Sequence, residues 1–61
     1  MKQVIYKSLD HYCVTDEANY NAGIQNAYAI KHLHGFESAE QVVEYFCEHF
    51  GSNPEDFIIK E

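Results

Sequence analysis

Histidine and cysteine residues occur in three pairs whose members are two positions apart: His11 with Cys13, His32 with His34, and Cys47 with His49. Imidazole and thiolate groups are common protein ligands of zinc. We place the second and third pairs on helices, where residues two apart point to nearly opposite sides. Only the first pair, on a strand, would share a face. Because no CxxC or HxxxH spacing occurs either, we expect no bound metal.

An active site is the second chemistry that these side chains suggest. Cysteine, histidine and carboxylate groups can be combined into a nucleophile and a base in almost any chain, so their presence is weak evidence for an active site. The sequence contains no Gly-rich phosphate loop and no nucleophile elbow. A chain of 61 residues also leaves little room for a pocket of about 300 Å³ beside its core. We therefore expect no catalytic residues, no cofactor and no enzymatic activity.

The formal net charge of −6 lies entirely within residues 37–56. Residues 1–36 carry three Asp or Glu and three Lys, and Lys60 balances Glu61. Glu40, Glu44 and Glu48 follow one another at intervals of four residues, so they form a ridge along one side of a predicted helix. Like charges at this spacing destabilise a helix by about 0.2–0.5 kcal/mol per pair.

Two explanations of this acidic ridge stay open. In one, the glutamates are good helix formers on a water-facing side, and their charge keeps the protein soluble. In the other, the ridge binds a basic surface of another protein, and this is the function that we predict. The residues predicted to bind this partner are Glu37, Glu40, Glu44, Tyr45, Glu48, Glu55 and Asp56.

The predicted partner is a protein rather than nucleic acid, because four Lys and no Arg offer few cations for phosphates. That partner could itself be a nucleic-acid-binding protein whose basic channel the ridge occupies as a nucleic-acid mimic. Small acidic inhibitors that phages and mobile elements direct against host nucleases work in this way. The comparison is with this class of protein only, because the sequence contains no motif of such a family.

A second candidate surface is neutral, polar and aromatic, and consists of Tyr20, Asn21, Gln25 and Tyr28. This surface could equally bind a second copy of the chain or a different protein. The alternative function, from a different class, is a small homodimeric structural protein whose acidic face serves solubility only.

Residues 3–9 and 12–15 are rich in β-branched and aromatic side chains and predict strands, with a tight turn at Asp10-His11. One strand followed by a loop fits nearly as well. A last strand is predicted at residues 57–60, after a turn in which Pro54 can begin a short helical turn.

Two helices are predicted between these strands. Asp16 or Asn19 begins a first helix that runs to about His34. The second is the better defined, because Ser38 and Gln41 form a capping box and Gly51 follows the last apolar position. Its apolar stripe predicts a core that includes Val42, Phe46 and Phe50.

The chain is thus expected to form one small α+β domain over residues 1–61, with the element order β-(β)-α-α-β. Both helices would pack on one face of a two- or three-stranded antiparallel sheet. No apolar stretch approaches the about 20 residues that span a membrane, and there is no signal-peptide pattern. With only two cysteines, we expect a cytoplasmic protein with free thiols.

Overall fold

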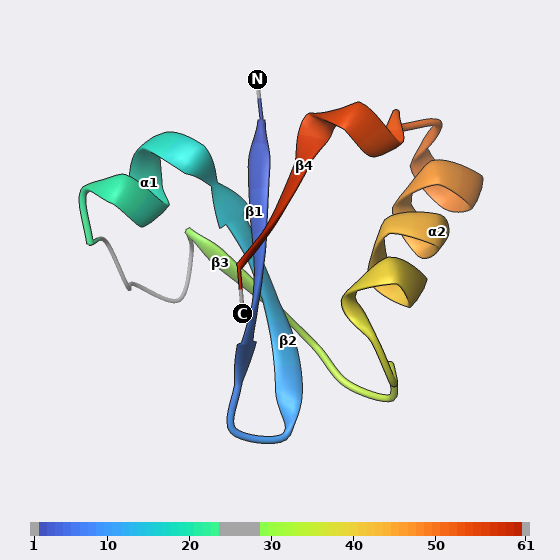
Figure 1. Cartoon of the computed structure of the whole chain (residues 1–61), viewed down its shortest axis with the longest axis horizontal. Coiled ribbons are helices and arrows are strands. Elements are labelled where there is room, and N and C mark those ends of the chain that lie inside the picture. The colour runs from blue at the N-terminus through green and yellow to red at the C-terminus, as the bar shows by residue number, and fades with distance from the viewer. Residues whose placement is uncertain (1, 24–28, 61) are drawn as a thin grey trace.

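The computed structural model describes residues 2–23 and 29–60, in which a mixed four-stranded sheet has helices on both faces (Figure 1). The strands are β1 (Gln3–Ser8), β2 (His11–Asp16), β3 (Ile30–Leu33) and β4 (Phe57–Lys60). The helices are α1 (Glu17–Asn21), α2 (Ala39–Phe50) and the short 3-10 helix η1 (Pro54–Asp56).

The strand order is β3-β2-β1-β4, so the two N-terminal strands lie at the centre of the sheet. β2 is antiparallel to both β1 and β3, whereas β4 is parallel to β1. Parallel strands cannot be joined by a tight turn, and the crossover that leads into β4 contains α2. The expected all-antiparallel sheet of two or three strands is therefore wrong in both strand count and direction.

Leu9 and Asp10 form the two-residue turn between β1 and β2, because Ser8 pairs with His11. The predicted hairpin is confirmed, but its turn lies one residue earlier than expected, which places His11 on the strand. Leu9 adopts φ 57° without being glycine, and its side chain is almost wholly exposed. A leucine in this left-handed region is a strained turn residue.

The main core lies between α2 and one face of the sheet. Ile5 of β1 and Val14 of β2 pack there against Ala39, Val42 and Phe46. Alternate strand residues point to opposite faces, so the β-branched residues of β1 and β2 supply both sides of the sheet. The predicted burial of Val42 and Phe46 is confirmed.

Both ends of α2 follow the capping signals in the sequence. Ser38 Oγ accepts a hydrogen bond from the Gln41 backbone N–H, and Gly51 ends the helix with φ 68°. The Gln41 side chain accepts from the Glu37 backbone N–H at 2.8 Å, one residue before the position that a capping box normally uses.

Phe50 is 63% exposed, so its predicted burial is wrong. It is the last residue of α2, and its ring contacts Tyr45 and Phe46 of the same helix. Lys31 Nζ lies 5.9 Å from the centre of the ring. The helical period identifies the side of the helix correctly, but the last turn carries Phe50 out of the core.

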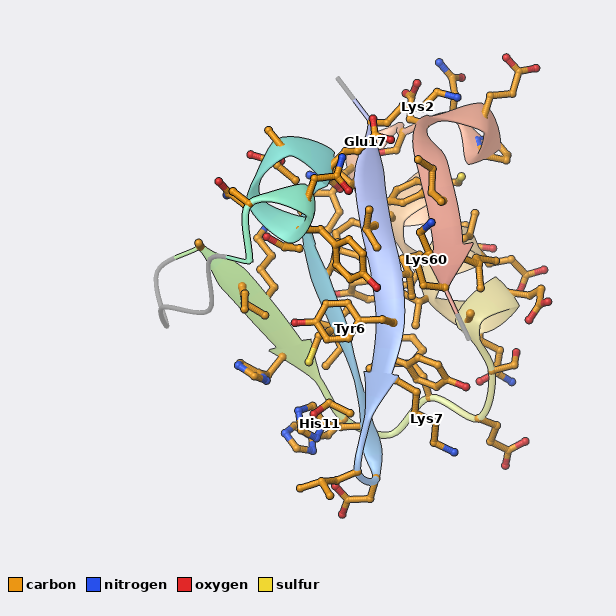
Figure 2. The ribbon with its side chains drawn as sticks, turned by 60° about the vertical axis from the view of Figure 1, so that its left-hand side comes forward. Lys2, Tyr6, Lys7, His11, Glu17 and Lys60 are labelled. Atoms are coloured by element: carbon orange, nitrogen blue, oxygen red, sulfur yellow. The ribbon has the colours of Figure 1, made fainter. Side chains whose placement is uncertain are left out.

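The opposite face of the sheet is covered by α1, toward one end. Val4, Cys13 and Thr15 are buried on this face, and the ring of Tyr6 packs on Tyr20 of α1 with 5.5 Å between ring centres. Figure 2 looks onto this side, with Tyr6 near the middle of the sheet and His11 toward the hairpin turn. The two helices therefore cover opposite faces, not one face as expected.

The first helix is also much shorter than predicted. It ends at Asn21, Gly23 adopts φ 73°, and Ile30–Leu33 is a strand rather than the end of a helix. The intervening residues 24–28 lie outside the described structure. Asn and Gly are weak helix formers, and pairing of residues 30–33 with β2 replaces the helical hydrogen bonds.

Candidate functional site

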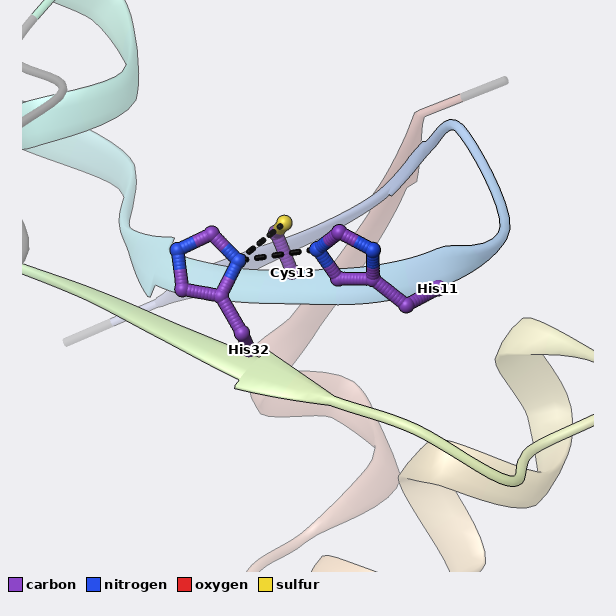
Figure 3. A group of neighbouring side chains, drawn as sticks. All are labelled: His11, Cys13 and His32. Carbon is purple, nitrogen blue, oxygen red and sulfur yellow. Dashed lines mark hydrogen bonds between the residues drawn. The ribbon is translucent and has the colours of Figure 1, made fainter.

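The register between β2 and β3 brings His11, Cys13 and His32 together on the face opposite α2. Cys13 pairs directly with His32, and His11 is two residues before Cys13 on the same face of β2. His32 Nδ1 lies 2.9 Å from His11 Nε2 and 3.4 Å from Cys13 Sγ. Figure 3 shows the three side chains converging. We call this group the His–Cys cluster.

Two further side chains surround His11. Asp10 Oδ1 lies 3.4 Å from His11 Nδ1, and this hydrogen bond is the main cause that lowers the pKa of Asp10. The His34 ring stacks on the His11 ring with 4.6 Å between their centres. His34 occupies the position opposite His11 when the β2–β3 register is continued by one pair.

Cys13 is buried, with 1% of its surface exposed. Burial raises the pKa of its thiol, and a hydrogen bond with the Tyr6 side chain acts in the opposite direction. The pKa of Tyr6 is itself raised, first by burial and then by Cys13. A buried thiol with a raised pKa is a poor nucleophile, so this cysteine lacks the features of a catalytic one.

The histidine and cysteine pairs of the sequence are therefore arranged differently from the expectation, under which no metal site was predicted. The sequence predicts a helix at His32, where residues two positions apart point to nearly opposite sides, but the structure places His32 on β3. On a strand, residues two apart share a face, so the same His-x-Cys and His-x-His spacings become favourable for binding one metal ion. The spacing of these residues indicates a possible metal site only when residues 30–33 are known to form a strand.

The acidic ridge of Glu40, Glu44 and Glu48 is exposed along the side of α2 that faces away from the sheet. Within residues 2–23 and 29–60, the only ion pair joins His11 and Asp10, so none of these glutamates forms an ion pair there. Glu37 precedes the helix and is exposed as well. Within the described residues, no ion pair offsets the mutual repulsion of the ridge.

The remaining predicted partner-binding residues lie on α2 and on η1. Tyr45 is 37% exposed and has Phe36 on one side and His49 on the other, with ring centres 5.5 and 4.5 Å away. Glu55 and Asp56 belong to η1, which contacts α2. Asp56 is half-buried and Glu55 is exposed.

A groove of about 340 Å³ lies beside the N-terminal end of α2. Tyr12, Glu40 and Ile59 line it together with Lys7 and Lys60. Glu40 belongs to the acidic ridge, so this end of the ridge adjoins a groove that two lysines also line.

The second candidate surface is only partly visible. Tyr20 and Asn21 are exposed on α1, and Lys60 Nζ lies 6.0 Å from the centre of the Tyr20 ring. Gln25 and Tyr28 lie outside the described residues. Tyr20 contacts Tyr6, so part of its ring serves the packing of α1 on the sheet.

No protein-family model, curated protein or solved structure matches this chain. Among the described helices, none has the length and apolar character needed to cross a bilayer.

Proposed function

We propose that the chain is a non-enzymatic binding module that attaches the outer side of α2 to a Lys- and Arg-rich surface of a partner protein. The observation that carries this proposal is the exposed acidic ridge, whose three glutamates form no ion pair in the described chain. A partner's cations would relieve this repulsion on binding. Electrostatic complementarity of this kind speeds association and selects among partners.

The spacing of the charges indicates what sort of surface would fit. Residues four apart on a helix are separated by about 6 Å along its axis. A DNA strand carries one charge per about 3.4 Å of axis. The ridge therefore has roughly half the linear charge density of one nucleic-acid strand, which favours a general basic protein surface over a channel specialised for phosphates.

Tyr45 supports a protein partner because it adds an aromatic group beside the carboxylates. Its ring is partly exposed yet held in place by Phe36 and His49. Aromatic residues are enriched in the cores of protein interfaces, where they lose little conformational entropy on binding. Phe50, exposed at the end of the same helix, extends this apolar area.

The test is capture of partners from lysate with three matched baits, at low and at moderate salt. Glu44→Lys reverses one charge in the ridge, whereas Glu17→Lys makes the same net change on α1, across the sheet from α2. The proposal expects a partner with a basic surface that binds the parent and Glu17→Lys proteins, releases Glu44→Lys, and dissociates as salt screens the charges.

Two results would contradict the proposal. One is a captured partner that binds the parent and Glu44→Lys proteins equally well at low salt. The other is capture of no partner, together with a concentration-dependent homodimer in light scattering that added salt leaves unchanged. The latter result would support the homodimeric alternative, in which apolar groups such as Phe50 are covered by a second copy.

A further inference from the structure

We propose that His11, Cys13 and His32 bind a Zn²⁺ ion, at a site separate from the acidic ridge. Their ligand atoms all lie within 4.8 Å of one another. One thiol and two imidazoles form a donor set that suits zinc, since sulfur and nitrogen are its common ligands in proteins. The site lies on the face of the sheet opposite α2.

The distances are close to those of a tetrahedral zinc ion. Zn–N bonds of about 2.0–2.1 Å and a Zn–S bond of about 2.3 Å place neighbouring ligand atoms about 3.3–3.6 Å apart. The Cys13 Sγ to His32 Nδ1 distance is 3.4 Å. The His11 Nε2 to His32 Nδ1 distance is 2.9 Å, so these two rings need to separate by only about 0.4 Å to admit the ion.

The backbone holds the three residues in place before any ion binds. His11 and Cys13 are on β2, and His32 pairs with Cys13 across the β2–β3 ladder. Ligands on paired strands lose less freedom on binding than ligands on loops, and sites on regular elements are more precise. His32 is exposed, which gives the ion a path from solvent.

Groups outside the ligand set also match those that commonly support zinc ligands. Metal-bound histidines usually donate their second ring N–H to a carboxylate. Here His11 faces His32 through Nε2 and Asp10 through Nδ1, so one tautomer can serve the metal and the carboxylate together. The hydroxyl of Tyr6 interacts with Cys13, where it can donate to a bound thiolate.

Binding requires both imidazoles to be neutral and Cys13 to be a thiolate. The thiol S–H bond therefore breaks as the Zn–S bond forms, and the proton passes to solvent. A tetrahedral ion has a fourth position, which a water molecule can fill.

The experiment is a titration with Co²⁺, which takes the same ligands as Zn²⁺ and reports them in its absorption spectrum. The parent protein should develop a thiolate-to-cobalt charge-transfer band at one equivalent, and Zn²⁺ should abolish it by displacing the cobalt. Cys13→Ser should lose the band, and the matched variant Cys47→Ser should keep it.

Since Cys13 is buried, its replacement can also disturb the fold, and His32 provides the second variant. It is exposed, so His32→Gln should retain the far-ultraviolet circular dichroism of the parent while binding Co²⁺ more weakly by over about 100-fold, more than outer groups usually contribute. The matched control is His49→Gln on α2. Asp10→Asn, which removes a supporting carboxylate, should weaken binding about tenfold.

Four outcomes would overturn the assignment. The folded parent could give no charge-transfer band with excess Co²⁺. The band could persist in Cys13→Ser and disappear in Cys47→Ser. Binding could be equally tight in His32→Gln and His49→Gln. Failure of Zn²⁺ to displace bound cobalt would refute zinc as the resident ion.

Discussion

Two phenylalanines on α2 should respond very differently to replacement by alanine, although both belong to the same apolar stripe. Phe46 is 5% exposed, and its ring packs against that of Phe57, with 5.6 Å between centres. Removing a buried phenylalanine costs about 3–5 kcal/mol. A domain of 61 residues has a total stability of roughly 3–9 kcal/mol, so Phe46→Ala should be largely unfolded or close to it.

Phe50 is 63% exposed, so most of its surface already contacts water. At about 25 cal/mol per Å² of buried apolar area, Phe50→Ala should lose only about 1 kcal/mol. For a domain of this size, that loss lowers the melting temperature by about 4–8 °C.

Thermal and urea unfolding followed by circular dichroism would compare the two variants with the parent. The urea slope shows whether each variant still unfolds as one cooperative unit. Equal destabilisation by the two substitutions would show that Phe50 is buried, and would refute the placement of the last turn of α2. A Phe46→Ala protein with the melting temperature of the parent would refute the core itself.

Two further predictions concern the opposite face and the hairpin. Leu9→Gly should raise the unfolding free energy by about 1 kcal/mol, because glycine adopts φ 57° without strain; unchanged or lower stability in urea titration would contradict the strained turn. In chelator-treated protein at neutral pH, iodoacetamide should alkylate Cys47 before Cys13, because burial both covers the Cys13 thiol and raises its pKa; mass spectrometry showing the reverse order would mark Cys13 as a reactive thiol.

Local signals were sufficient for α2 because its ends and its stripe are encoded by neighbouring residues. Ser38, Gln41 and Gly51 act within one turn of the helix that they begin or end. The strands at 3–8 and 11–16 follow from dense β-branched residues. By contrast, the exposure of Phe50 depends on how far the helix extends over the sheet. The helical period predicts the side of the helix on which a residue lies, but not this extent.

β3 was missed because its four residues become a strand through pairing rather than propensity. The three-residue spacing of Ile30 and Leu33 is also compatible with a helix, and the decisive interaction is the pairing with β2. The His–Cys cluster depends on that pairing and could not be foreseen without it. The parallel direction of β4 likewise results from the crossover through α2.

The acidic ridge is the feature whose role matters most for function, and Glu44 lies at its centre. Glu44→Lys replaces two repulsive contacts with two attractive ones, at Glu40 and Glu48. Each repulsion removed and each attraction added is worth about 0.2–0.5 kcal/mol, so the free domain should gain about 0.8–2 kcal/mol at low salt, where screening is weak. The same lysine should oppose a basic partner surface.

The most direct measurement combines a thermal melt of Glu44→Lys with a titration of the captured partner at low and at moderate salt. The proposed function predicts that stability rises while affinity falls, and that the difference in affinity from the parent shrinks as salt increases. Higher stability with unchanged affinity at low salt would contradict it and would leave the glutamates as a solvated helix face.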